Sequence, residues 1–244
     1  MRGVLVQAVG GLLGGDLATA ADFAAAIEMI HAFSLIHDDL PCMDNDDMRR
    51  GKPACHVRFG EANALLAGDL LAIEAFEVVV GANCTGEMRA DACRVLSAAS
   101  GARGMIYGQE LDMDGEGKSL TAEALYKIER KKTGALIRAG VELGIVAAGK
   151  QPEDYPTLLN YGDKLGQVFQ MVDDILDVTA DVGLLGKPVG SDDRNAKTTY
   201  VSLFGLAKTR EDALALTNEA IGSLSALNAG DDSFLQEYAQ RLYN

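Results

Sequence analysis

The chain has 244 residues, a formal net charge of −14 and an apolar content of 48%. This length is sufficient to bury a substantial core, and the composition is that of a globular protein rather than of a disordered chain. The acidic excess, without any basic stretch, excludes the electrostatic footprint of a nucleic-acid-binding protein. We therefore expect no nucleic-acid partner.

Helical spacing of apolar residues recurs along the chain, whereas alternating strand patterns are almost absent. The expected helices cover residues 4–13, 22–40, 61–81, 87–108, 121–130, 135–148, 156–178, 200–206, 209–226 and 231–243. Pro41 ends the second of them, and a polar connection follows up to residue 60. Because no domain linker or repeat interrupts the pattern, we expect residues 1–244 to form one all-α domain.

The cysteines and the apolar runs indicate the compartment. The four cysteines form no CxxC pair, and a chain of this size does not need disulfides, so we expect reduced thiols and a cytoplasmic location. No uninterrupted apolar run reaches the ~18 residues that a membrane helix needs, so we expect no membrane span.

The densest acidic stretch lies between His31 and Arg50, in HAFSLIHDDLPCMDNDDMRR. Five aspartates fall within ten residues, and their repulsion is costly unless cations lie among them. Mg²⁺ takes oxygen ligands, and Arg49 and Arg50 offer the fork geometry that suits phosphate. The alternative, a solvated acidic loop, places negative charge at a helix C-terminus, where the helix dipole disfavours it. The stretch predicts a metal and phosphate site beside an apolar pocket.

A second acidic motif, DDILD, contains Asp173, Asp174 and Asp177 within the helix expected over 156–178. Asp173 and Asp177 share a helix face and could converge on one cation. The alternative is a solvated acidic stripe, which the apolar flanks disfavour because a carboxylate among apolar neighbours needs a partner. Two such helices facing each other would form an acidic cleft that takes metal when an anion such as a diphosphate bridges it.

Basic residues near glycine or threonine form a third, weaker set. Lys132, Lys187 and Lys197 lie at element boundaries, where backbone N–H groups and hydroxyls can add phosphate contacts. Each is equally compatible with an ordinary surface charge. His31 lies seven residues before Asp38, on nearly the same helix face, and is also compatible with a core histidine. No zinc spacing and no Ser/His/Asp order is present.

These motifs together resemble the trans-isoprenyl diphosphate synthase family, closest to its bacterial farnesyl and geranylgeranyl diphosphate synthase group. The matching segments are DDLPCMDNDDMRRGKP, FQMVDDILDV, HVRFGEANALLAGD, KKTGALIRAG and LGKPVGSDDRNAKTTY. The resemblance implies an all-α type I isoprenoid (terpenoid) synthase bundle around a deep central cavity, and a homodimer. It implies a short-chain trans-prenyltransferase that uses Mg²⁺ to condense isopentenyl diphosphate with dimethylallyl or geranyl diphosphate.

The resemblance also assigns roles to individual residues. Three Mg²⁺ ions are implied, with ligands from both acidic motifs: Asp38, Asp39, Asp44, Asp173, Asp174 and Asp177. The implied contacts to the allylic diphosphate are Arg49, Lys132, Thr133, Gln170, Lys187 and Lys197. The implied contacts to isopentenyl diphosphate are Arg2, His31 and Arg50. Stabilisation of charge on the departing diphosphate, the catalytic task, would depend on Asp38, Asp39, Asp44, Asp173, Asp174, Lys132 and Lys197.

Phe33 is expected to set the length of the product. It lies five residues before Asp38, about 7–8 Å along the helix, and in the family a bulky aromatic residue there is similar to the floor found with C15 products. Ser34 beside it is small, so Phe33 alone would form the floor. Farnesyl diphosphate is the favoured product, and geranylgeranyl diphosphate is the alternative.

The N-terminus departs from the family pattern. Related chains carry an N-terminal helical segment that ends in a Gly-Gly-Lys-Arg-x-Arg-Pro-like run, whereas here only Arg2 matches its last arginine and Gly3 replaces the proline. The lysine and first arginine expected at the isopentenyl diphosphate site are missing. Three hypotheses follow: an active prenyltransferase, a type I terpene cyclase, or a truncated non-catalytic subunit that binds diphosphates.

Overall fold

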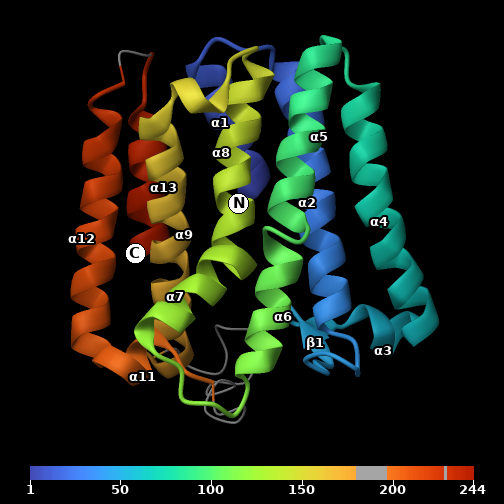
Figure 1. Ribbon diagram of the computed structural model, residues 1–244, viewed down its shortest axis with the longest axis vertical. Helices are drawn as coiled ribbons and strands as arrows, with labels where there is room; N and C mark the ends of the chain where they lie inside the picture. The colour runs from blue at the N-terminus through green and yellow to red at the C-terminus, as the bar shows by residue number, and fades with distance from the viewer. Residues whose placement is uncertain (180–196, 228–229) are drawn as a thin grey trace.

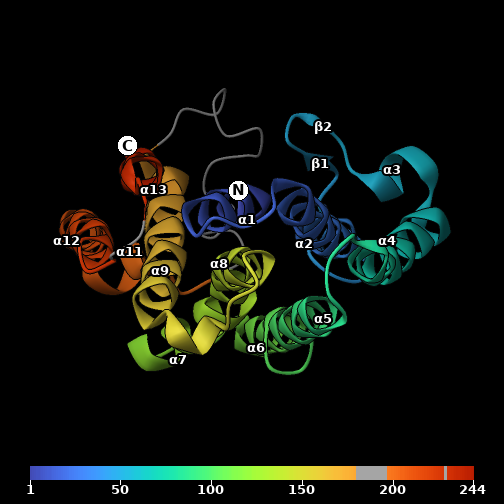
Figure 2. The same cartoon turned by 90° about the horizontal axis from the view of Figure 1, so that it is seen from above.

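The computed structural model describes residues 1–179, 197–227 and 230–244, and these residues are almost entirely helical. The long helices run roughly side by side (Figure 1), and α1, α2 and α8 lie towards the middle of the bundle when it is seen from above (Figure 2). The α-helices are α1 (Arg2–Leu12), α2 (Leu17–Asp38), α3 (Cys55–Phe59), α4 (Glu61–Gly81), α5 (Gly86–Ser100), α6 (Met105–Gly115), α7 (Ala122–Glu129), α8 (Ala135–Ala147), α9 (Pro156–Thr179), α11 (Tyr200–Phe204), α12 (Leu206–Leu224) and α13 (Ser233–Tyr243). The expected all-α fold class is confirmed.

Two short helices of other types complete the described chain. Arg130–Gly134 forms a π-helical turn, η1, between α7 and α8, and Pro152–Asp154 forms a 3₁₀ turn, η2. Within the described residues the strands are limited to β1 (Met48–Arg49) and β2 (Lys52–Pro53), which pair antiparallel. This hairpin follows α2 and supports the acidic stretch.

Helix α2 is the apolar helix that carries the first acidic motif. Asp16 caps its N-terminus by accepting a hydrogen bond from the Thr19 backbone N–H at 2.8 Å, an arrangement that satisfies an otherwise unpaired donor. The helix packs against α1, α4 and α8. Among the described helices, α2 is also long and apolar enough to cross a membrane, but this apolarity has a second explanation, because half of that stretch is buried inside the bundle.

Helix α8 joins the two parts of the hydrophobic core. Its residues Leu136 and Leu143 pack in a cluster with residues of α2, α4 and α5, and its residues Ile137 and Ile145 pack in a second cluster with residues of α1, α9, α12 and α13. All four side chains are fully buried. Full burial of one such side chain contributes about 1.5–3 kcal/mol, so α8 is a rigid support for the adjoining η1.

The structure differs from the expected elements in several places. The helix expected over 87–108 is two helices, because the chain breaks between Gly101 and Gly104. A Cβ at Gly104 would lie 1.9 Å from the Ala99 carbonyl oxygen, so only glycine permits this tight break. The polar connection over 41–60 contains the hairpin and α3, which periodicity did not predict. Most of the predicted loop at 179–199, including Lys187, lies outside the described residues.

Candidate active site

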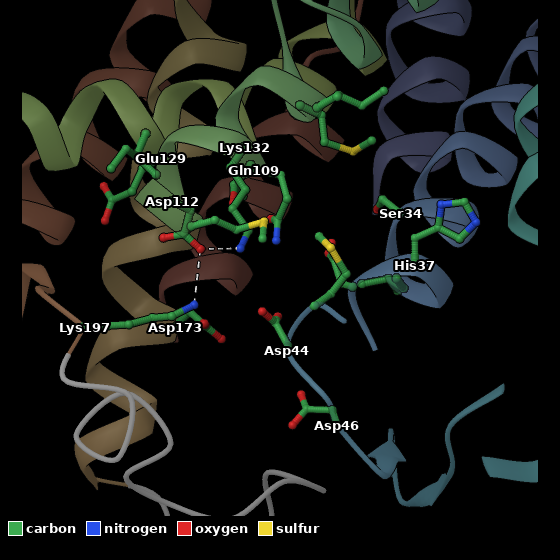
Figure 3. A pocket seen from close by; sticks show the side chains of 18 of the residues that line it. Ser34, His37, Asp44, Asp46, Gln109, Asp112, Glu129, Lys132, Asp173 and Lys197 are labelled. Carbon is green, nitrogen blue, oxygen red and sulfur yellow. Dashed lines mark hydrogen bonds and ion pairs between the residues drawn. The ribbon is translucent and has the colours of Figure 1, made fainter. Parts of the chain in front are cut away.

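A cavity of about 1200 Å³ opens where α2, α6, α7, η1 and α9 meet. Figure 3 shows carboxylates and ammonium groups around it, with Asp44 and Asp46 on one side and Asp112, Asp173 and Lys197 on the other. Apolar side chains of α2 and α6 line the remaining wall. The two acidic motifs therefore lie on one cavity, as the sequence predicted.

The first acidic motif places two of its aspartates on the cavity and buries a third beside them. Asp38 and Asp44 line the cavity. Burial raises the pKa of Asp38 to about 6, with Asp44 and Asp39 adding to this effect and Lys132 opposing it. Asp39 is only 2% exposed and accepts a hydrogen bond from Arg49 Nε at 2.9 Å. Asp39 is thus already paired inside the motif, which agrees with a supporting position.

Arg49 lines the cavity and also pairs with carboxylates of the first motif. Besides Asp39, its guanidinium lies 3.6 Å from the Asp46 carboxylate. Burial alone would lower the pKa of Arg49, but these carboxylates outweigh it and raise the pKa. The guanidinium therefore stays charged. A contact from Arg49 to a diphosphate therefore stays a prediction.

The second motif places Asp173 and Asp174 on the cavity. The Asp174 carboxylate accepts hydrogen bonds from Gln170 Nε2 at 3.0 Å and from the Tyr200 backbone N–H at 2.8 Å. These bonds connect α9 to the start of α11 and fix the carboxylate. Asp177 is 3% exposed and does not belong to the cavity lining. The convergence of Asp173 and Asp177 on one cation therefore stays a prediction.

The donor set of the cavity fits a hard divalent cation. Its carboxylate oxygens are the ligands that Mg²⁺ prefers, and Asp44 and Asp39 add negative charge beside the buried Asp38 that a cation would relieve. Within the described residues, no three acidic, histidine or cysteine side chains already lie close enough together to hold a metal ion. That an anion between the two acidic walls completes the coordination stays a prediction.

Helix η1 carries Lys132 and Thr133 into the cavity. Its backbone is held closely on two sides. A Cβ at Gly108 of α6 would lie 2.2 Å from the Lys132 backbone nitrogen, and a Cβ at Gly166 of α9 would lie 2.9 Å from the Gly134 Cα. The Thr133 hydroxyl donates to Gln170 Oε1 at 3.3 Å. Thr133 and Gln170, predicted separately, thus lie together, and a π-helical turn at such a position is typical of functional sites.

The sequence analysis missed several polar residues on the cavity wall, among them Gln109, Asp112 and Glu129. Asp112 accepts from Lys132 Nζ at 2.6 Å and from Lys197 Nζ at 3.2 Å. Burial alone would raise the pKa of Asp112, but these two ammonium groups outweigh it and lower the pKa. Burial and the nearby Asp174 and Asp112 raise the pKa of Glu129 to about 9. Gln109 Nε2 is buried without a hydrogen-bond partner. Gln109 and Asp112 lie three residues apart in GQELD, and Glu129 stands alone on another helix. Neither arrangement forms a distinctive motif.

A cationic lobe of the cavity contains Arg2, His31 and Arg50. Arg2 is 7% exposed, and its Nε has no hydrogen-bond partner among the residues that the structure describes. Burial lowers the pKa of Arg2 to about 10, and the neighbouring Arg50 acts in the same direction, whereas Glu28 opposes it. Burial together with Arg2 and Arg50 lowers the pKa of His31 to about 4, so the imidazole is neutral at pH 7. Two guanidinium groups and an orphaned donor suit a doubly charged anion.

Phe33 and Ser34 lie at the apolar end of the cavity and are almost fully buried. The Phe33 ring packs edge-on against the His37 ring, with centroids 5.7 Å apart. His37 Nε2 lies 3.0 Å from the Leu65 carbonyl oxygen of α4, and a Cβ at Gly68 would collide with this ring at 2.0 Å. The small Gly68 thus leaves room for His37, which supports Phe33.

Comparisons with known proteins agree with this architecture. The model of the family described as Polyprenyl synthetase matches residues 1–231. A farnesyl diphosphate synthase of Escherichia coli is 48% identical over 231 residues, which cover 93% of this chain and 77% of the relative, and one of Micrococcus luteus is 44% identical over 93% and 79%. A Helicobacter pylori geranyltransferase, solved with magnesium and isoprenyl diphosphate, is similar with a TM-score of 0.88 and 38% identity, over 99% of this chain and 81% of that one. A Legionella pneumophila geranyltransferase has a TM-score of 0.89 and 37% identity, over 100% and 81%.

Proposed function

Because the chain belongs to the polyprenyl synthetase family, we propose that it is a short-chain prenyltransferase that condenses isopentenyl diphosphate with dimethylallyl or geranyl diphosphate to give farnesyl diphosphate. The observation that carries the proposal is one cavity of about 1200 Å³ that is lined by both acidic motifs, by basic side chains and by an apolar wall. The domain is taken to be the whole of residues 1–244.

Mg²⁺ is the proposed cofactor, in three ions. The ligands proposed are Asp38, Asp39, Asp44, Asp173, Asp174 and Asp177. Bound between the acidic walls, the metal neutralises charge that builds on a departing diphosphate. The placement of Asp38, Asp44, Asp173 and Asp174 on one cavity supports this proposal.

The residues of the chain would then divide the work between the two substrates. Lys132, Lys197 and Thr133 hold the allylic diphosphate, and charge on the leaving group strengthens their contacts as the carbon–oxygen bond breaks. Arg2 and Arg50 hold the diphosphate of isopentenyl diphosphate. The double bond of this second substrate attacks the allylic cation, and a proton then leaves to the released diphosphate.

The apolar wall of the cavity would protect the allylic cation. Water would quench an allylic cation, so the wall must exclude it. Phe33, held by His37, limits the depth available to the growing tail and favours a C15 product. Geranylgeranyl diphosphate remains the second candidate product, since Met105, Ile106 and Met113 of α6 also line the cavity and add apolar wall for a longer tail.

A homodimer is also part of the proposal. The outer face of α4, at the edge of the bundle in Figure 1, exposes Leu66, Leu70 and Ile73 at helical spacing, with Leu66 63% and Ile73 69% exposed. A continuous apolar face of this kind marks an interaction surface, and a second copy is the simplest occupant because paired identical faces close a symmetric dimer. Sedimentation analysis of Ile73→Glu tests this, since loss of a dimer is expected. A cytoplasmic location completes the proposal.

The decisive experiment is condensation with radiolabelled isopentenyl diphosphate. Dimethylallyl and geranyl diphosphate are supplied in turn, with and without Mg²⁺, and product alcohols are separated by chromatography. Metal-dependent incorporation into a C15 product is expected. Ionisation of geranyl diphosphate without coupling would instead indicate a cyclase, and metal-dependent binding without turnover would indicate a non-catalytic subunit.

A further inference from the structure

Asp112 connects two lysines that come from distant parts of the chain. Its Oδ2 atom accepts a hydrogen bond from Lys132 Nζ of η1 at 2.6 Å and from Lys197 Nζ at 3.2 Å. The two dashed lines in Figure 3 mark these contacts at the cavity wall. All three side chains are largely buried, with 20–25% of each exposed. One carboxylate oxygen thus fixes both ammonium groups.

We propose that Asp112 is a positioning residue that holds Lys132 and Lys197 together so that both point towards the allylic diphosphate. The inference rests on the proposed prenyl transfer and deepens it, because it names a group that neither touches the substrate nor binds metal. The class of ligand concerned is an inorganic or organic diphosphate.

The need for such a group follows from charge. Two ammonium groups brought to one wall repel each other, and a carboxylate between them removes that repulsion. Each ammonium has three N–H donors, so a single bond to Asp112 leaves donors free for phosphate oxygens. Two cations and one anion still sum to one positive charge, which is attractive to a diphosphate.

The surrounding backbone explains why the side chains need this anchor. Gly108 fixes α6 against the Lys132 backbone, and Thr198, next to Lys197, accepts from the Leu120 backbone N–H at 3.2 Å. The backbones are therefore fixed, whereas a lysine side chain has four flexible bonds whose freedom is lost when it is ordered. Asp112 restrains these bonds before the substrate binds, which is preorganisation.

The test combines steady-state kinetics with a binding measurement. Calorimetry follows the binding of Mg²⁺ and inorganic diphosphate. Asp112→Asn keeps the shape but removes the charge. A charge-assisted hydrogen bond is lost at each lysine, so we expect the diphosphate affinity to fall roughly 10- to 100-fold. The KM for the allylic diphosphate rises and kcat falls, whereas the KM for isopentenyl diphosphate stays unchanged. Asp154→Asn is the matched control, because it makes the same chemical change at an exposed residue outside the cavity lining.

A double-mutant cycle separates positioning from a merely structural role. In Lys132→Ala and Lys197→Ala backgrounds, the effect of Asp112→Asn on diphosphate affinity should shrink at least threefold, because part of what Asp112 positions is gone. An undiminished effect in both backgrounds would overturn the proposal, as would an unchanged affinity or a tighter one, since tighter binding would make Asp112 a competitor of the substrate. Binding is measured without turnover, so an inactive wild type would refute the proposed function and leave this result readable.

Discussion

Glu129 offers a direct test of the electrostatics of the cavity. This residue of α7 lies on the cavity wall, and burial, with Asp174 and Asp112 nearby, raises its pKa from 4.5 to about 9. An unfolded chain ionises Glu129 above pH ~4.5, whereas the folded protein keeps it protonated up to about pH 9. Between pH ~4.5 and about pH 9, a rising pH stabilises the unfolded state, in which Glu129 ionises, but not the folded state. Glu129 therefore lowers the free energy of unfolding at neutral pH.

The size of the effect follows from the shift. At pH 7 the difference of 2.5 pH units from 4.5 corresponds to about 3.4 kcal/mol at most, at ~1.4 kcal/mol per unit. Because the side chain is partly exposed, we expect about half of this. Glu129→Gln removes the ionisation and keeps the shape, so it should raise the melting temperature by roughly 3–6 °C at pH 7. At pH 5 only about half a unit remains, and the gain should fall below about 2 °C.

The assay is scanning calorimetry of both proteins at pH 5 and pH 7, at one protein concentration and without metal or diphosphate. Metal is left out because cations in the cavity favour the ionised carboxylate. Glu123→Gln, exposed in the first turn of the same helix, is the control and should give no pH-dependent gain. A Glu129→Gln gain that is equal at both pH values would refute the reasoning, because it would then not arise from ionisation.

Three further variants test the geometry of the cavity and the core. Phe33→Ala should lengthen the product beyond C15, and an unchanged product alcohol on chromatography would contradict its role as the floor. Gly108→Ala places a methyl group 2.2 Å from the η1 backbone, and we expect at least a tenfold loss of kcat/KM, whereas Gly222→Ala, with open space around it, should cost nothing. Tyr161→Phe removes a buried hydroxyl that donates to a backbone carbonyl of α13 at 2.7 Å, and urea denaturation should show a loss of about 1–3 kcal/mol; a neutral variant would mean that the carbonyl finds another partner.

Much of the fold was predictable because long apolar helices dominate it. Helix α4 occupies the predicted residues 61–81 without change, and α7 lies within the helix predicted over 121–130, with Thr121 as its N-cap. The break between α5 and α6 was not predictable, because it depends on the close approach of Gly104 to the Ala99 carbonyl, a tertiary constraint. The β1–β2 hairpin is too short to produce an alternating pattern.

The candidate site was predictable where charges cluster in the sequence. Asp38 and Asp173 are surrounded by further aspartates, and their excess charge demands an explanation. Asp112 and Glu129 are single acids on ordinary helices, and their importance arises only when folding brings Asp112 to Lys132 and Lys197. Spacing along one helix carries no information about such partners, because they come from other elements.

The π-helical turn η1 has a consequence for how the protein can evolve. A π-turn holds one residue more than an α-helical turn and is less favourable, so deleting one residue from 130–134 would let α7 and α8 continue as one regular helix. Such a chain would gain local regularity, but every residue before the deletion would rotate by about 100° relative to α8. Lys132 would then leave the cavity. The irregular turn is therefore the local structural feature that keeps Lys132 on the cavity wall.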